Sequence, residues 1–238
     1  MPNPWARQLE ALLGGSWPRN YLAFATETLG PDPANPSNLI TQVGWAQAHD
    51  GIEIDYGSVI LDWTAEPWIN VYYLEEQLAK VTARMAEKGH NYPVTIDRMR
   101  SEGLPPSDIL PAFKEMLLGA IANGDHIAGH NAWHFDLPLI HLNLKRACDQ
   151  GLEIPGESVL DTGMVDKARM LEFPVSEYQD IGCLYSAVYK SGRRARCSLD
   201  GHCNEIYNLN IDANEAHDAG VDSRAVVRLV EAMRAAFA

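Results

Sequence analysis

The stretch Tyr21–Thr28, which reads YLAFATET, decides the fold of this 238-residue chain. Its apolar run has the length of a β-strand, and the turn-forming segment GPDP at residues 30–33 ends it. Glu27 follows Ala25 by two residues, so both side chains point to the same face of the predicted sheet. The strand therefore carries an acidic group on a face that is otherwise apolar.

Other segments of the chain alternate between strand and helix patterns. Residues 40–46 and 52–61 predict two strands that form a hairpin through His49-Asp50-Gly51, and residues 126–128 predict a short strand. Apolar residues at helical spacing predict helices over residues 5–13, 73–88, 107–122 with Ser107 as the N-cap, 135–150, 161–171, 176–190, 198–206 and 216–237. Strands that come first and then alternate with helices are typical of an α/β fold with a mixed sheet covered by helices.

The composition excludes several classes of protein. The chain has 19 basic and 32 acidic side chains, a net charge of −13, so a general electrostatic surface for nucleic acid is excluded. An enzyme whose site holds divalent cations is still allowed, because the metal reverses the local charge. No apolar run of about 18 residues is present, which predicts no membrane partner. The start of the chain does not read as a signal peptide, and the four cysteines are too sparse for a disulfide scaffold, so we expect reduced thiols in a cytoplasmic protein.

Three acidic residues occupy positions where the hydrophobic pattern predicts apolar side chains. Asp222 and Asp136 lie on the apolar stripes of their helices, and Glu27 lies on the inward face of its strand. A single acid at a helix start is explained by the helix dipole. Three inward acids repel one another and lose hydration, so a divalent cation is their simplest partner. Hard oxygen ligands favour Mg²⁺ or Mn²⁺ over zinc.

Four short segments follow one another along the chain in an informative order: FATETLG at residues 24–30, GHNAWHFD at 129–136, LDT at 160–162 and HDAGVD at 217–222. Each is weak by itself, but their order and spacing together resemble the motifs of the DnaQ-like 3′–5′ exonucleases of the DEDDh type. Two departures stand out. The loop between Asn131 and Asp136 is one residue longer than in many members, and Ala25 stands where the family has its first aspartate.

This resemblance implies a ribonuclease H-like α/β fold, with a mixed five-stranded sheet flanked by helices. Residues 1–238 would form a single exonuclease domain, with residues 1–18 as an N-terminal helical extension. Two Mg²⁺ or Mn²⁺ ions would be held by Glu27, Asp136, Asp222 and an acid at position 25, with His217 as the general base. Because Ala25 has no side-chain oxygen, we expect this chain to be nearly inactive. We interpret Ala25 as an engineered replacement of a native aspartate.

The implied reaction is the hydrolysis of nucleotides from the 3′ end of single-stranded DNA or RNA. The candidate substrate-binding residues are Thr28, Leu29, Asn131, Trp133, Phe135, Arg193, Arg194 and Arg196. By resemblance, Leu29 presses against the terminal base, while the two aromatic residues either stack on that base or belong to the core. The arginines either contact phosphate or form a solvated loop.

Two other functions stay open at this point. One is a catalytically silent module that binds nucleic acid or a nucleotide, and the other is a nuclease for short oligonucleotides or another small phosphodiester. The sequence identifies neither a polymerase or repair partner nor an oligomeric state.

Overall fold

A mixed five-stranded sheet forms the centre of the protein, with the strand order β3-β2-β1-β4-β5. The computed structural model describes residues 4–193, 198–211 and 217–237. β1 pairs antiparallel with β2 and parallel with β4, β2 pairs antiparallel with β3, and β4 pairs parallel with β5. The strands are β1 (Tyr21–Thr28), β2 (Ile40–His49), β3 (Ile52–Ile60), β4 (His126–Gly129) and β5 (Val159–Asp161). The predicted mixed sheet is thus confirmed.

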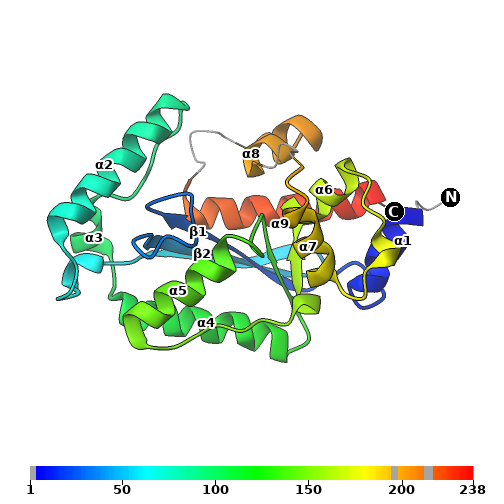
Figure 1. Ribbon diagram of the computed structural model, residues 1–238, viewed down its shortest axis with the longest axis horizontal. Coiled ribbons are helices and arrows are strands. Elements are labelled where there is room, and N and C mark those ends of the chain that lie inside the picture. The colour runs from blue at the N-terminus through cyan, green and yellow to red at the C-terminus, as the bar shows by residue number, and fades with distance from the viewer. Residues whose placement is uncertain (1–3, 194–197, 212–216, 238) are drawn as a thin grey trace.

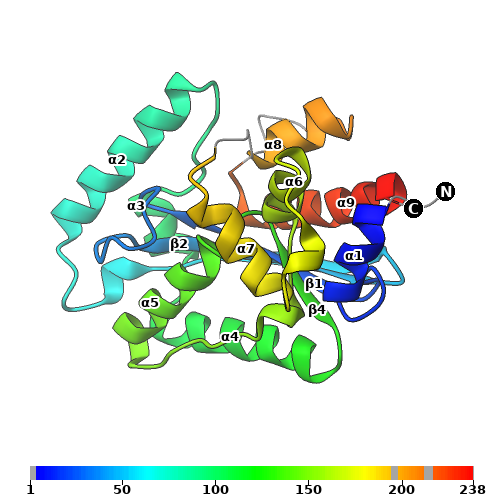
Figure 2. The same ribbon diagram turned by 45° about the vertical axis from the view of Figure 1, so that its right-hand side comes forward.

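Helices cover both faces of this sheet (Figures 1 and 2). α9 lies across β1 and β2 on one face, and α4 and α5 pack together on the other. The helices are α1 (Pro4–Leu12), α2 (Val71–Glu87), α3 (Ile96–Glu102), α4 (Pro106–Ala122), α5 (Asp136–Cys148), α6 (Thr162–Met170), α7 (Ile181–Lys190), α8 (Leu199–Gly201) and α9 (Ala219–Phe237). None of the helices in the described ranges is long and apolar enough to span a membrane.

The turn between β2 and β3 has the backbone that the sequence predicts. Asp50 and Gly51 both have positive φ, at 53° and 78°. Two consecutive residues with positive φ match a tight hairpin turn, which follows the right-handed twist of the strands. The predicted hairpin is confirmed.

Two predicted helix starts are wrong. α4 begins at Pro106 after Pro105, and not after Ser107, because a proline at the first helical position needs no hydrogen-bond partner for its nitrogen. α7 begins at Ile181, five residues later than expected, where the Asp180 carboxylate accepts the backbone N–H of Cys183 at 2.8 Å. The short helix α3 carries too few apolar residues to show a periodicity, and the sequence pattern did not predict it.

β1 supplies side chains to two separate cores because consecutive strand residues point to opposite faces. Tyr21 and Ala23 pack with α9 and α6, while Leu22 and Phe24 pack with α4 and α5. The same alternation places Ala25 and Glu27 on the face covered by α9. The end of β1 thus brings its acidic side chain toward the start of that helix.

Gly44 in β2 allows α9 to begin directly on the sheet. A Cβ atom at this position would lie 2.1 Å from the backbone carbon and oxygen of Ala219, the first residue of the helix. Gly44 also pairs with Ala25 across the two strands. The close approach of α9 therefore depends on the missing side chain at position 44.

Replacing Gly44 with alanine should destabilise the protein. The new methyl group would meet helix backbone, which moves only as a unit, so we expect a loss of about 1–3 kcal/mol in the free energy of unfolding. Denaturant-induced unfolding measures this loss. Gly119→Ala is the matched control, since a Cβ atom there meets nothing within 4 Å and alanine favours the helix by up to about 1 kcal/mol. Equal stability of the Gly44→Ala variant and the parent would contradict the packing argument.

Candidate functional site

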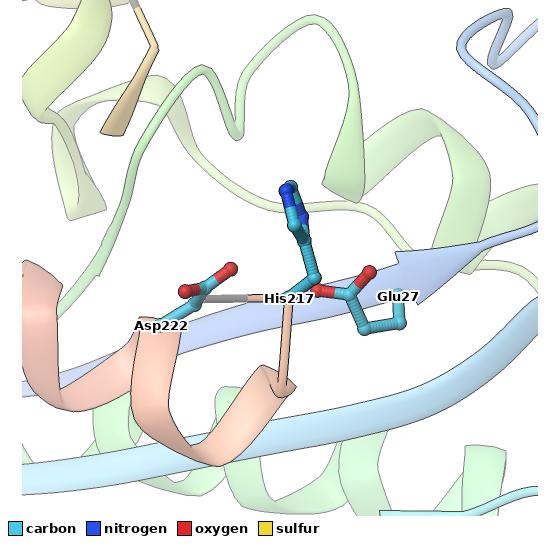
Figure 3. Close-up of side chains that lie close together, drawn as sticks. All are labelled: Glu27, His217 and Asp222. Carbon is cyan, nitrogen blue, oxygen red and sulfur yellow. The ribbon is translucent and has the colours of Figure 1, made fainter. Parts of the chain in front are cut away.

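Glu27, His217 and Asp222 converge at the junction of β1 and α9 (Figure 3). Each offers one possible ligand atom, and these atoms all lie within 4.8 Å of one another. Within the described residues, this is the group of histidine, cysteine and acidic side chains whose spacing suits a metal ion. Glu27 comes from the end of the strand, and Asp222 from the first turn of the helix.

The two carboxyl groups in this cluster strongly disfavour a double negative charge. Glu27 is only 6% exposed, and its pKa is raised well above the usual range. Burial is the main cause, and the negative charges of Asp222 and Asp136 raise it further. Burial likewise raises the pKa of Asp222 to about 7. A proton held between these two carboxyl groups would relieve their repulsion in the absence of a metal ion. A bound cation would replace that proton, and carboxylate oxygens are suitable ligands for Mg²⁺ or Mn²⁺.

Asp136 reaches the same place from the opposite face of the sheet. It is the first residue of α5, and its Oδ1 accepts the backbone N–H of Thr26 at 3.0 Å and the hydroxyl of Thr26 at 2.6 Å. Burial raises the pKa of Asp136 to about 7, although these two hydrogen bonds lower it. Its charge acts on both Glu27 and Asp222, so the three predicted acids form one electrostatic cluster.

The turn that precedes Asp136 is held by another buried acid. The Asp161 carboxylate accepts the backbone N–H groups of Asn131 at 2.8 Å, Trp133 at 2.9 Å and Met164 at 2.9 Å. Asn131 has a φ of 63°, a left-handed conformation that asparagine tolerates better than most residues. The structure thus explains the LDT segment at residues 160–162 as the support of this turn.

His217 lies immediately before α9 in a left-handed backbone conformation, with a φ of 70°. Positive φ is costly for a histidine, and such strain is concentrated at functional sites. Burial lowers the pKa of His217, and the neighbouring His90 lowers it further. The His90 ring meets the His217 ring edge to face, with centroids 4.9 Å apart. His217 is therefore neutral at neutral pH and is able to accept a proton.

Gln42 is a buried polar residue that sequence reasoning missed. Its Nε2 donates to Oδ2 of Asp218 at 2.9 Å, and its Oε1 accepts the backbone N–H of Ala219 at 3.2 Å. Oδ1 of Asp218 accepts the backbone N–H of Gly220 at 3.0 Å and caps the helix. Gln42 thus ties β2 to the turn that carries His217. The sequence feature that could have pointed to Gln42 is a polar residue within a largely apolar strand.

Ala25 is half-buried on β1, opposite Gly44 of β2. By strand alternation its methyl group shares a face with Glu27, two residues further along. A methyl group offers no ligand atom, so position 25 contributes nothing to the acidic cluster.

Four other candidates for substrate binding lie at the end of β1, in the β1–β2 connection and in the turn before α5. Thr28 donates its hydroxyl to the carbonyl of Gly30 at 2.8 Å, and Leu29 lines a hollow beside the β1–β2 connection. Phe135 is half-buried and packs against the core on the side of α5. Trp133 packs between the two cores and borders a separate cavity of about 370 Å³ beside α5.

Of the three candidate arginines, Arg193 is the one that lies within the described residues. Arg193 donates to the carbonyl of Leu171 at 2.9 Å, and its guanidinium lies 5.8 Å from the ring centroid of Phe173. These contacts anchor Arg193 to the segment after α6. Arg194 and Arg196 lie outside the described residues.

No family model and no curated protein matches this sequence significantly. Several solved structures resemble its fold. A structure of exonuclease I superposes with a TM-score of 0.60 at 14% identity, covering 91% of this chain and 41% of that one. Exonuclease I from Methylocaldum szegediense gives 0.57 at 17% identity, with 91% and 40% covered. E. coli exonuclease I in complex with a dT13 oligonucleotide gives 0.55 at 14% identity, with 89% and 40% covered.

These identities establish a likeness of fold, and the chain spans about two fifths of the length of the exonuclease I structures it matches. The predicted ribonuclease H-like fold, a mixed five-stranded sheet flanked by helices, is thereby confirmed.

Proposed function

We propose that this chain is a metal-dependent 3′–5′ exonuclease domain of the DEDDh type, extending over residues 1–238, whose first metal ligand is replaced by Ala25. The observation that carries the proposal is the cluster of the buried Glu27 and Asp136 with the half-buried Asp222, with His217 beside it. These groups come from β1, α5 and α9, elements far apart in the sequence. Such a cluster is costly to bury without a function that uses its negative charge.

Glu27, Asp136 and Asp222 are the residues that would hold Mg²⁺ or Mn²⁺ at this site. Two such ions, when bound, activate a water molecule and stabilise the charge on the leaving oxygen of a phosphodiester. Thr26 orients Asp136 through two hydrogen bonds to one of its oxygens. The protein thereby holds its acidic side chains in place before any ligand arrives.

His217 is the proposed general base. Its neutral imidazole takes the proton of the attacking water, a contribution of roughly 10²–10⁴-fold to the rate in general acid–base catalysis. His90 positions the ring by packing against it, and Gln42 holds the turn through Asp218 and Ala219. Leu29 and Thr28 would border the terminal nucleotide, next to Glu27 on the chain.

A single strand is the proposed substrate. E. coli exonuclease I is known in complexes with single-stranded DNA, with a dT13 and with a dA16 oligonucleotide, and this support comes through the fold alone. The acidic surface also disfavours a duplex gripped along its length, since phosphates are repelled outside the cation site. The arginines at 193, 194 and 196 remain proposed contacts to phosphate.

Restoring an acid at position 25 should restore hydrolysis. Ala25→Asp adds the missing oxygen ligand, so we expect it to raise the rate of nucleotide release by at least about 100-fold with Mg²⁺ or Mn²⁺. The assay follows a 5′-labelled single-stranded oligonucleotide, which a 3′–5′ exonuclease shortens into a ladder. Ala25→Asn is the matched control because it has the same shape without the charge, and it should remain nearly inactive.

The same assay separates the alternatives. If Ala25→Asp binds the oligonucleotide without cutting it, the chain is a silent binding module and the catalytic proposal is wrong. If the variant cuts a dinucleotide much faster than a longer strand, the substrate is a small phosphodiester. His217→Ala in the Ala25→Asp background should reduce the restored rate by about 10²–10⁴-fold.

The metal-free protein should lose stability as the pH rises. Burial raises the pKa values of Asp136 and Asp222 to about 7, whereas an unfolded aspartate titrates near about 3.9. Protonation therefore favours the folded state, and its stabilising effect is lost as the pH rises through about 7. In EDTA we expect the melting temperature to fall by at least about 2–4 °C between pH ~6.5 and ~8.5, the shift that about 1 kcal/mol produces at this chain length. The lowered pKa of His217 acts in the opposite direction, but at more acid pH.

Mn²⁺ should restore the melting temperature at the upper pH, because a ligand that binds only the folded state stabilises it. The matched variant is Asp222→Asn, in which the pH dependence and the Mn²⁺ effect should both decrease. An equal Mn²⁺ effect in the parent and in Asp222→Asn would show that the ion binds elsewhere.

A further inference from the structure

The hollow that Leu29 lines extends to the start of α2. Its volume is about 310 Å³, near the lower limit of about 300 Å³ that is usual for small-molecule sites. The residues that line it come from the β1–β2 connection, from the start of α2 and from the end of α5: Leu29, Ser37, Leu39, Trp68, Ile69, Asn70, Tyr73, Leu74 and Arg146. Leu29 connects this hollow to the end of β1, two residues beyond Glu27.

Two aromatic side chains of the hollow are exposed to solvent. Trp68 is 47% exposed and Tyr73 is 44% exposed. Trp68 is nevertheless fixed in place, because its ring packs edge to face against the buried Trp63 with centroids 5.8 Å apart. Rigid, exposed aromatic faces in a concave site are costly in water and are suited to stacking on a flat ligand.

Arg146 adds a positive charge to the hollow. Its guanidinium lies 5.8 Å from the ring centroid of Trp68. Nucleobases stack on aromatic rings and on guanidinium planes alike, and the positive charge attracts the adjoining phosphate. The chain as a whole carries a net charge of −13. A cation beside exposed aromatic rings therefore favours a ligand that has both a flat ring and a negative charge.

α2 begins at this hollow, because its N-cap Asn70 and its residue Tyr73 both line it. Tyr73 and Arg84 fall on one side of the helix, since eleven residues make about three turns. His90, three residues after the end of α2, packs on the His217 ring, so this end of α2 lies beside the proposed general base. With a rise of about 1.5 Å per residue, Tyr73 lies about 16 Å along the helix from Arg84.

From these observations we propose that the hollow between α2 and α5 binds an unpaired nucleobase upstream of the 3′-terminal nucleotide, with Trp68 and Tyr73 as its stacking surface. This inference rests on the proposed function, because it assumes that the acidic cluster holds the 3′ end of the same strand. The site would select single strands, whose bases are free to leave the stack. It would tolerate any base, because every base has a flat face.

The test measures affinity as a function of strand length in the parent chain, which is expected to bind without cutting. Fluorescence anisotropy with Mn²⁺ gives the dissociation constant of oligothymidylates from a dinucleotide to an octanucleotide, and competition gives that of thymidine monophosphate. Trp68→Ala and Tyr73→Ala should each weaken octanucleotide binding by about tenfold, the typical cost of losing one base–aromatic stack. Both variants should bind thymidine monophosphate as the parent does.

Two controls separate stacking from loss of structure. Trp68→Phe keeps an aromatic face and should retain most of the affinity, while Tyr56→Ala removes an equally exposed aromatic residue from β3, 55% exposed, and should change nothing. A 2-aminopurine probe moved one position at a time from the 3′ end should lose fluorescence at an upstream position in the parent and keep it in Trp68→Ala.

The outcomes distinguish this inference from the proposed function. If Trp68→Ala and Tyr73→Ala bind the octanucleotide as tightly as the parent, the hollow is not a base site, while the acidic cluster retains its proposed role. If they lose the monophosphate and the octanucleotide equally, the hollow belongs to the terminal nucleotide and the upstream assignment is wrong. If the parent binds neither probe with Mn²⁺, both the proposed function and this inference are overturned.

Discussion

The mutual repulsion of Glu27, Asp136 and Asp222 is the constraint on which the rest of this structure depends. Burial and neighbouring charge raise the pKa values of all three carboxyl groups. Such a cluster lowers the stability of the fold, so the surrounding structure must hold the three acidic side chains rigidly. Thr26 on one side and the start of α9 on the other provide that support.

Much of that support comes from residues with no role in the proposed chemistry. Gly44 brings the backbone of α9 against β2, Gln42 ties the turn before α9 to the sheet, and Asp161 holds the turn before α5 through two backbone N–H groups. The turns before α5 and α9 share one feature. Each contains a residue with positive φ, Asn131 or His217, and each leads into a helix with an acidic residue in its first turn. The strained backbone is stable because buried hydrogen bonds surround it.

β1, β2, β3 and the long helices could be predicted because their hydrophobic periods are strong, whereas the three-residue β5 is too short to show a period. β1 has the predicted bounds, and the hairpin after β2 follows from its Asp-Gly turn. The predicted N-cap at Ser107 is wrong because Pro106 already occupies the first position of the helix. α3 was not predicted because it is a short helix with few apolar residues. Helix ends depend on individual capping contacts, which a periodic pattern does not record.

The α/β fold class and the inward positions of three acidic residues could be inferred from the residues alone, because hydrophobic period and charge are local properties of the chain. Only the tertiary structure decided that Glu27, His217 and Asp222 lie within 4.8 Å of one another, that His90 packs on His217, and that Trp68 and Arg146 border one hollow. His90 belongs to a loop, and Trp68 and Arg146 are 78 residues apart, so no periodicity connects them. Contacts of this kind arise from how the helices pack on the sheet, and packing is settled by the whole chain at once.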